Sequence, residues 1–285
     1  MKVLALVSLG LLSLNALALP TENLAALKNS HSHLKGNINK DYDFEGIVKL
    51  SNCSGSLIIF NGMPMTAKAV VMTNGHCIQK PGGYLNPGEA WVNRPIDREM
   101  KLYDAKMKLF PIKAKKIIYA TMTDTDVAYY ELGQSYEEIL KTTKVRPFTL
   151  DSIRPSLAQP IEIISGYWDR GYSCEIDNFV FKIKEGQWTW TDSIRYTEGC
   201  DTIGGTSGSP LIAKGEKRVI GINNTSNEKG ERCTLNNPCE VSSNGDVFSQ
   251  KGIRYGQQTY PIYNCLNPDF TINLSLSGCE LPKGK

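Results

Sequence analysis

The sequence lacks long apolar runs after residue 19, a run of basic residues and an acidic tail. The missing apolar runs exclude a later transmembrane helix of ordinary length. The formal net charge is only +3 over 285 residues, so we expect no nucleic-acid partner. With 41% hydrophobic and 21% charged residues, the composition is that of a globular protein, and the length suits one large domain or two packed halves.

Patterns typical of metal sites are also scarce. The chain has three histidines and no Cys-x-x-Cys pair, which argues against a zinc site made of Cys and His. His31 and His33 lie in a polar stretch, where we interpret them as solvated side chains rather than metal ligands. We therefore expect no metal and no cofactor.

The N-terminal residues indicate export. Lys2 precedes an apolar run over residues 3–19, and the small residues Ala16 and Ala18 are typical of a cleavage site. This layout predicts a signal peptide over residues 1–18, because the run is short for a membrane anchor and lacks a charged stop. Residues 19–40 are mostly polar, and this composition predicts a propeptide or a flexible arm. We expect the folded domain, residues 41–285, to be a monomer outside the cytoplasm, in the extracellular space or the periplasm, without a membrane contact.

The eight cysteines agree with export, since an even number in an exported chain usually forms disulfides. Eight cysteines allow 105 connectivities, so spacing alone does not assign the pairs. The cysteines are Cys53, Cys77, Cys174, Cys200, Cys233, Cys239, Cys265 and Cys279.

Short apolar or alternating runs recur from residue 44 onward, separated by Gly, Pro, Asn and Asp. They have the length of strands and are rich in Val, Ile, Tyr and Phe, which predicts an all-β sandwich or barrel. Residues 135–141 are the best short helical segment, and the Pro-containing residues 146–160 could join two halves. The predicted strands are 46–50, 55–60, 68–72, 115–120, 126–132, 161–165, 178–183 and 218–222.

The segment Gly204–Pro210, GGTSGSP, places a serine between glycines. A Ser hydroxyl becomes a nucleophile when a base removes its proton, and the attacked carbonyl then needs N–H donors in a preset geometry. Glycines allow the tight backbone that directs such donors to one point. Ser207 is thus a candidate nucleophile, with Gly205 and Ser207 as N–H donors. A Gly/Ser-rich surface turn is the alternative.

The segments NGHC and DTDVAYYEL supply a candidate base and a carboxylate. His76 is the only histidine in the predicted folded domain, so a histidine base must be this one, and a Cys53–Cys77 bridge would hold its turn. Asp126 could orient the imidazole. Asp124 competes with Asp126, which we favour because an apolar strand follows it at once. The alternatives are a structural histidine and a turn aspartate.

The order CSGSLI, NGHC, DVA and GTSGSP, over residues 53–210, resembles the trypsin-like (chymotrypsin-fold) serine peptidases. The resemblance implies two six-stranded antiparallel β-barrels, at about residues 41–145 and 146–285, with the active site in the cleft between them. It implies His76 as general base, Asp126 as its orienting carboxylate and Ser207 as nucleophile. It also implies an oxyanion hole formed by the N–H groups of Gly205 and Ser207.

The chain departs from the animal members of this family at the serine loop. Thr206 stands where zymogen-activated members carry an Asp that pairs with a new N-terminal amine, so we expect the pocket to form without that ion pair. Ser209 replaces a Gly, as in bacterial members. The bacterial branch suggests a Cys174–Cys200 disulfide. The remaining local pairs would be Cys233–Cys239 and Cys265–Cys279.

Substrate preference is less determined by the sequence. Asp201, six residues before Ser207, occupies the place of the acid that binds Lys or Arg in trypsin, and it favours a basic P1 residue. The alternative is that Asp201 points away from the pocket. Thr202 and Asn223 are further substrate-binding candidates. Asn223 stands where glutamyl endopeptidases carry a His, so glutamate specificity lacks its cationic partner.

Four other functions remain alternatives. They are a glutamyl-endopeptidase-like or broadly specific enzyme, an inactive protease-fold binding protein, a chaperone-like periplasmic protease, and a lipase or esterase. The last is disfavoured because an α/β-hydrolase carries its His after the Ser, whereas His76 precedes Ser207.

Overall fold

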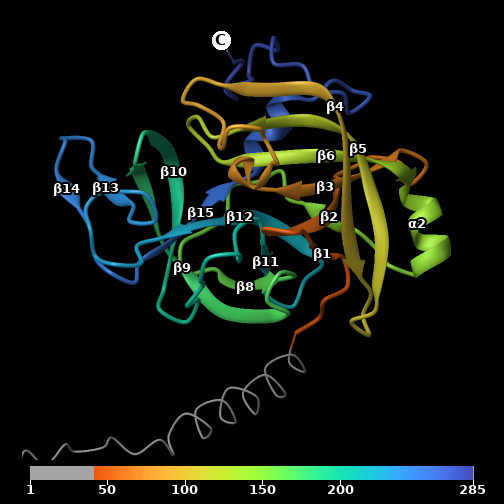
Figure 1. Ribbon diagram of the computed structural model, residues 1–285, viewed down its shortest axis with the longest axis horizontal. Helices are drawn as coiled ribbons and strands as arrows, with labels where there is room; N and C mark the ends of the chain where they lie inside the picture. The colour runs from red at the N-terminus through yellow and green to blue at the C-terminus, as the bar shows by residue number, and fades with distance from the viewer. Residues whose placement is uncertain (1–41, 285) are drawn as a thin grey trace, which may run out of the picture. The chain divides into compact units, whose positions relative to one another are not determined.

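The computed structural model describes residues 42–284. The predicted signal peptide and the arm at 19–40 lie outside these residues. Over the described range the chain forms fifteen strands, one α-helix and two short 3-10 helices (Figure 1). None of the helices at 42–284 is long and apolar enough to cross a membrane.

The elements follow one another in chain order. The strands are β1 (Ile47–Lys49), β2 (Ser54–Phe60), β3 (Lys68–Thr73), β4 (Ala90–Tyr103), β5 (Leu109–Thr121), β6 (Val127–Ser135), β7 (Phe148–Leu150), β8 (Pro160–Ser165), β9 (Arg170–Glu185), β10 (Trp188–Tyr196), β11 (Pro210–Ala213), β12 (Arg218–Ser226), β13 (Cys239–Val241), β14 (Val247–Phe248) and β15 (Arg254–Gln258). The helices are η2 (Gly75–Cys77), α2 (Tyr136–Thr143) and η3 (Tyr260–Cys265).

The strand pairings close into two rings. The first runs β1–β4–β5–β6–β3–β2 and closes through the β1–β2 pair. The second runs β12–β11–β8–β9–β10–β15 and closes through the β12–β15 pair. All pairs within the rings are antiparallel, and β7 joins the rings by parallel pairing with β2 and β12. The expected two six-stranded antiparallel barrels are therefore confirmed.

The strands with apolar runs line the barrel interiors. Leu57, Val71 and Tyr130 of β2, β3 and β6 are fully buried in one core cluster of the first barrel. Ile163 and Leu211 of β8 and β11 are buried in the second barrel. All of these except β11 are runs that the sequence predicted as strands, because apolar side chains at strand spacing stabilise the fold by leaving water.

The predicted helical segment forms α2, which begins at a capping box. The side chain of Ser135 accepts a hydrogen bond from the backbone N–H of Glu138, and the Glu138 carboxylate accepts one from the backbone of Ser135. This exchange satisfies N–H groups that have no partner within the helix. The helix ends at Lys144, which adopts a left-handed conformation.

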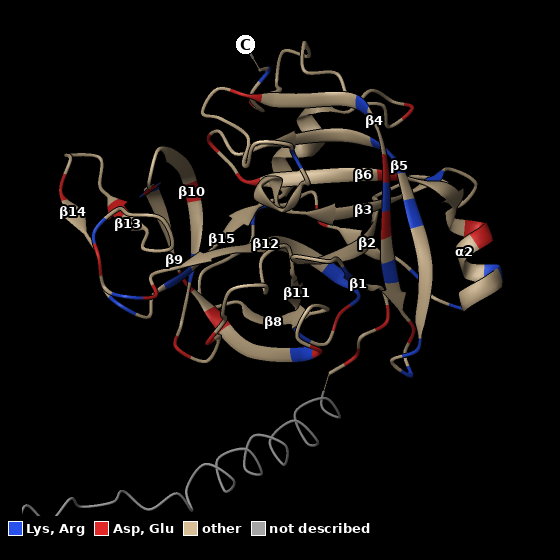
Figure 2. Cartoon of the chain, in the orientation of Figure 1, with Lys and Arg blue, Asp and Glu red and all other residues tan. Residues whose placement is uncertain are grey.

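The β4–β5 hairpin was not predicted in full, because β4 carries charged residues and a proline. Figure 2 shows basic and acidic residues along these two strands. Pro95 lies where the register of the β4–β5 pair shifts, a position that tolerates the missing N–H. Most of the middle of β4 is exposed, so its strand pattern is weak.

The residues after Ile262 extend over the first barrel rather than forming a long terminal helix (Figure 1). Ile272 and Leu281 pack into the cluster that contains Phe60, and the Tyr119 hydroxyl donates to the carbonyl of Pro282 at 2.9 Å. All eight cysteines are paired, as the sequence predicted. The disulfides are Cys53–Cys77, Cys174–Cys200, Cys233–Cys239 and Cys265–Cys279.

Candidate active site

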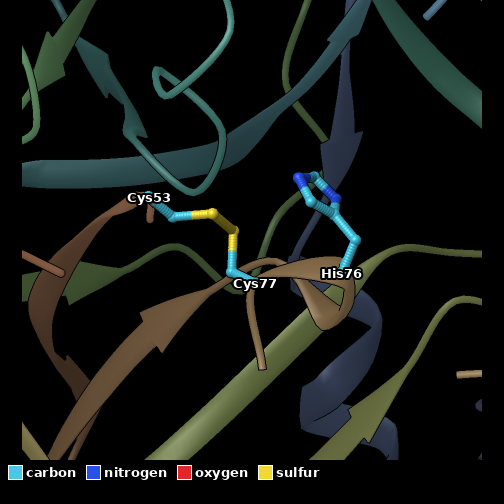
Figure 3. Close-up of side chains that lie close together, drawn as sticks. All are labelled: Cys53, His76 and Cys77. Carbon is cyan, nitrogen blue, oxygen red and sulfur yellow. A yellow bond between two sulfur atoms is a disulfide. The ribbon is translucent and has the colours of Figure 1, made fainter. Parts of the chain in front are cut away.

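The structure places His76 in the one-turn helix η2, directly after β3. The Cys53–Cys77 disulfide ties this turn to the residue before β2, as Figure 3 shows. A side chain at Gly75 would put its Cβ 1.9 Å from the carbonyl oxygen of Thr121, so only glycine allows this close approach. The turn therefore holds the imidazole at a defined place beside β5 and β6.

Asp126 lies just before β6 and is fully buried. Its Oδ2 is 2.7 Å from Nδ1 of His76, and its Oδ1 accepts the backbone N–H of His76 at 3.0 Å. Its own carbonyl accepts a hydrogen bond from Nδ2 of Asn74 at 2.7 Å. Because a carboxylate only accepts, Nδ1 must carry the proton, which leaves the lone pair on Nε2.

The serine loop is held by its carbonyl groups. Ser54 donates its N–H to the carbonyl of Ser207 at 2.8 Å and its hydroxyl to the carbonyl of Gly205 at 3.2 Å. The indole N–H of Trp168 donates to the carbonyl of Gly204 at 2.7 Å. Gly208 adopts φ +81°, and a Cβ there would meet Ser54 and Thr73 at 2.2 Å. These contacts require the glycine-rich sequence.

The N–H groups of Gly205 and Ser207 receive no hydrogen-bond acceptor from any residue of the described range 42–284. Gly205 has φ +89°, a conformation that glycine adopts without strain. The hydroxyl of Ser207 donates to the carbonyl of Asn224 at 3.1 Å. Two neighbouring backbone donors next to a serine hydroxyl are thus available to a negatively charged oxygen.

His76, Asp126 and Ser207 line the same open cavity, whose empty space, including the part that opens to solvent, is about 560 Å³. Tyr84, Trp188 and Trp190 form an aromatic part of its otherwise largely polar wall. The ring of Tyr84 lies edge-on between those of His76 and Trp188, at centroid distances of 6.2 and 5.7 Å. The cavity therefore has the size of a side-chain pocket and contains a base, a carboxylate and a hydroxyl.

Burial by itself would lower the pKa of His76. The charge of Asp126, the hydrogen bond to it and the charge of Glu185 act in the opposite direction, and they raise the pKa of His76 above its usual 6.5. The imidazole is thus a stronger base than a free histidine.

Comparison with known proteins identifies the family. The model of the trypsin-like peptidase domain matches residues 53–222, which is more than half of the chain. This range contains His76, Asp126 and Ser207. The chain belongs to the trypsin-like peptidase family. It is a serine endopeptidase by this membership, and no curated protein sequence matches it.

The comparison with solved structures finds proteases that are similar to this trypsin-like peptidase. The protease domain of MamO from Magnetospirillum magneticum is 12% identical with a TM-score of 0.49, covering 79% of this chain and 97% of that one. A Nocardiopsis protease is 14% identical with a TM-score of 0.44, covering 78% and 96%. The Cellulomonas bogoriensis chymotrypsin is 13% identical with a TM-score of 0.40, covering 78% and 94%.

Of the predicted substrate-binding residues of this peptidase, Thr202 and Asn223 line the cavity and are nearly fully buried. Asp201 does not line it. Its side chain is 69% exposed and forms an ion pair with Arg254, which also donates to the carbonyl of Thr202. The structure thus leaves Asp201 out of the cavity lining, paired with Arg254 and largely exposed to solvent.

Asp124, the competitor of Asp126, also lies elsewhere. It adopts φ +57° and bridges to Trp190 through its backbone, with N–H donation to the carbonyl of Thr189. It lines a second cavity next to the C-terminal residues. Its position therefore makes it a turn residue that joins the two barrels.

Sequence reasoning missed Glu185, the last residue of β9. It is 4% exposed and lines the cavity of His76 and Ser207. Its Oε2 accepts from the Thr225 hydroxyl at 2.6 Å, and its Oε1 accepts the N–H of Asn236 at 2.8 Å. Burial raises the pKa of Glu185, although both hydrogen bonds and the His76 imidazole oppose the rise. No motif marks this residue in the sequence.

Cys53, His76 and Cys77 offer ligand atoms within 4.8 Å of one another (Figure 3). Both sulfurs belong to one disulfide, so neither is a thiolate that could hold a metal ion. The group is therefore a disulfide that fixes the histidine turn, and it does not have the ligands of a metal centre.

Proposed function

We propose that this peptidase cleaves peptide bonds by a Ser207–His76–Asp126 triad, through an acyl-enzyme intermediate. The supporting observation is the pair of hydrogen bonds from His76 to the buried Asp126, in a cavity that Ser207 also lines. Two unengaged N–H groups beside the serine add to this support. A binding protein that had lost catalysis would not need any of these groups.

The proposed reaction has two stages, acylation of Ser207 and release of the acyl group by water. The Ser207 hydroxyl leaves the Asn224 carbonyl, transfers its proton to Nε2 of His76, and its oxygen attacks the substrate carbonyl. The resulting oxyanion accepts hydrogen bonds from the N–H groups of Gly205 and Ser207. His76 returns the proton to the leaving amine as the C–N bond breaks. Water then releases the acyl group by the same steps, with His76 again as base.

The test is replacement of the nucleophile. In Ser207→Ala, the rate of hydrolysis of a denatured protein substrate falls to the small residual rate that substrate binding and the oxyanion donors alone provide. Labelling by a fluorophosphonate probe is lost. The matched control is Ser209→Ala, which changes a buried hydroxyl two residues away. Undiminished hydrolysis by Ser207→Ala would exclude the triad.

We also propose that the enzyme is secreted as a monomer and prefers Lys or Arg at P1. The predicted signal peptide supports secretion. The P1 preference no longer rests on Asp201, which faces Arg254 outside the cavity. It is supported instead by the acidic residues Glu185 and Glu228 that line the cavity. Mapping cleavage sites in a denatured proteome by mass spectrometry tests it, and equal cleavage after Lys, Glu and Leu would refute it.

A further inference from the structure

Glu185 is a buried acid that the triad mechanism does not use. It lies at the end of β9, in the wall of the cavity that contains His76 and Ser207. Its two hydrogen-bond donors, the Thr225 hydroxyl and the Asn236 N–H, are neutral. Among the groups of residues 42–284 that shift its titration there is no Lys or Arg. The carboxylate is therefore buried without a permanent counter-charge.

A buried charge without an opposite partner is costly, and an amide of the same shape would fold with less penalty. The neighbouring charges do not relieve this cost. Asp126 has the same sign, and His76 must be neutral whenever it acts as a base. When Glu185 is ionised, the cavity carries negative charge at Glu185 and Asp126, and the exposed Glu228 adds to it. Such a field attracts a cation.

The cavity also suits the shape of a long basic side chain. Trp188 and Trp190 are nearly buried aromatic residues in its wall, and Tyr84 and Leu235 are partly exposed apolar residues that also line it. The alkyl part of a Lys or Arg side chain packs against such surfaces, while its charged end can bind a carboxylate. Each oxygen of Glu185 accepts one hydrogen bond in the structure, which leaves acceptor capacity for a substrate donor.

We propose that Glu185, and not Asp201, selects substrates in which a lysine ammonium or an arginine guanidinium occupies the cavity beside the scissile bond. This inference rests on the proposed triad, because the same cavity serves both. The recognition is a charge-assisted hydrogen bond between the substrate cation and the carboxylate of Glu185. Asp201 forms an ion pair with Arg254 and is not among the residues that line the cavity.

A purely structural role for Glu185 makes a different prediction. Asn236 belongs to the loop that the Cys233–Cys239 disulfide closes, so Glu185 could simply attach this loop to β9. In Glu185→Gln the side-chain oxygen still accepts from Asn236, and the amide N–H₂ donates to the Thr225 hydroxyl. The variant thus keeps the attachment and removes only the charge. A structural role predicts no change in selectivity.

The experiment compares kcat/KM for fluorogenic peptides that differ only by Lys or Gln, placed in turn at P1, P2 and P3. Wild type is expected to prefer Lys at one position, and Glu185→Gln is expected to reduce that Lys/Gln ratio at least about tenfold, the size typical of losing a buried charged partner. Asp201→Asn is expected to keep the ratio. Absence of a Lys preference in wild type, or an unchanged ratio in Glu185→Gln, overturns the inference.

Fluorophosphonate labelling separates this inference from the proposed function. Labelling of Glu185→Gln by the probe shows that Ser207 still reacts. The Lys/Gln ratio compares two substrates of the same variant, so a changed ratio then reports substrate selection. If wild type itself does not label, the proposed triad fails instead. If Glu185→Gln does not fold, Glu185→Asp provides the second test, because it keeps the charge. Loss of the Lys preference in a Glu185→Asp enzyme that labels normally would count against recognition by charge.

Discussion

Asp126 accepts two hydrogen bonds from His76, one from the ring at 2.7 Å and one from the backbone at 3.0 Å. The pair fixes the position of the histidine backbone and the orientation of its ring together. Because the carboxylate is fully buried, water does not compete for either bond. In the proposed mechanism, this arrangement keeps the lone pair on Nε2 available for the proton of Ser207.

The variant Asp126→Asn should nearly abolish catalysis without unfolding the protein. An amide N–H₂ at this place can donate to Nδ1, which stabilises the wrong tautomer and moves the proton to Nε2. We expect kcat to fall about 10⁴-fold, as loss of the orienting carboxylate does in enzymes of this mechanism. Steady-state kinetics measures the loss, and circular dichroism shows whether the fold persists. A loss of less than tenfold would contradict the assigned role of Asp126.

The acid limb of the pH–rate profile should report the raised pKa of His76. Activity needs the neutral imidazole, so kcat/KM rises with pH as His76 loses its proton, and the midpoint lies above 6.5. The charge of Glu185 contributes to this rise, together with that of Asp126. Removing it in Glu185→Gln lowers the pKa of His76, and the acid limb moves to lower pH.

A peptide substrate without basic residues keeps this measurement independent of substrate charge. The control is Asp97→Asn, which removes an exposed carboxylate of the β4–β5 hairpin that pairs with Lys113 and Lys115. Its profile should coincide with that of wild type. A shift of the acid limb to higher pH in Glu185→Gln would show that Glu185 does not act on His76 by its charge.

Trp168 is expected to position one donor of the oxyanion hole. Its indole N–H binds the carbonyl of Gly204 at 2.7 Å. In a trans peptide the N–H points opposite to the carbonyl, so this bond directs the Gly205 N–H away from the indole. In Trp168→Phe we expect kcat to fall about 10- to 100-fold with KM nearly unchanged, since loss of a whole oxyanion donor costs about 10²–10³-fold.

A peptide aldehyde, which forms a tetrahedral adduct, provides a second readout for Trp168→Phe. Its affinity should fall in parallel with kcat, whereas that of a product peptide should not change. The control is Trp168→His, whose ring can restore an N–H donor. Equal losses in kcat and in product affinity would indicate a general disturbance of the cavity rather than a misplaced N–H.

Local sequence patterns predicted the strands and several of the residues that line the cavity, because these depend on nearby residues, whereas the two-barrel arrangement was implied by the family resemblance. The apolar runs of β2, β6 and β12 became strands. Gly75 of the histidine turn and Gly208 of the serine loop lie where the structure shows close backbone approaches. The β4 strand was missed because its middle is exposed and charged, so the sequence there lacks the alternating apolar residues that indicate a strand.

The two carboxylates show why substrate recognition was harder to predict. The direction of Asp201 depends on Arg254, which arrives from a strand far along the chain. Glu185 reaches the cavity because Thr225 and Asn236, from two other segments, bind its two oxygens. Such long-range placements leave no pattern in either local sequence, and the structure is needed to see them.

Removing the Cys53–Cys77 disulfide should affect both stability and catalysis. The bond closes a loop with a sequence separation of 24, so the double variant Cys53→Ala/Cys77→Ala should lose about 3 kcal/mol of unfolding free energy. Because Cys77 follows His76 directly, kcat should also fall. The matched control, Cys265→Ala/Cys279→Ala, opens a loop with a separation of 14 outside the active-site cavity, and it should lose similar stability while keeping kcat. Denaturant unfolding and steady-state kinetics measure the two effects. An unchanged kcat in the first variant would show that the turn holds His76 without the disulfide, through Gly75 and Asp126 alone.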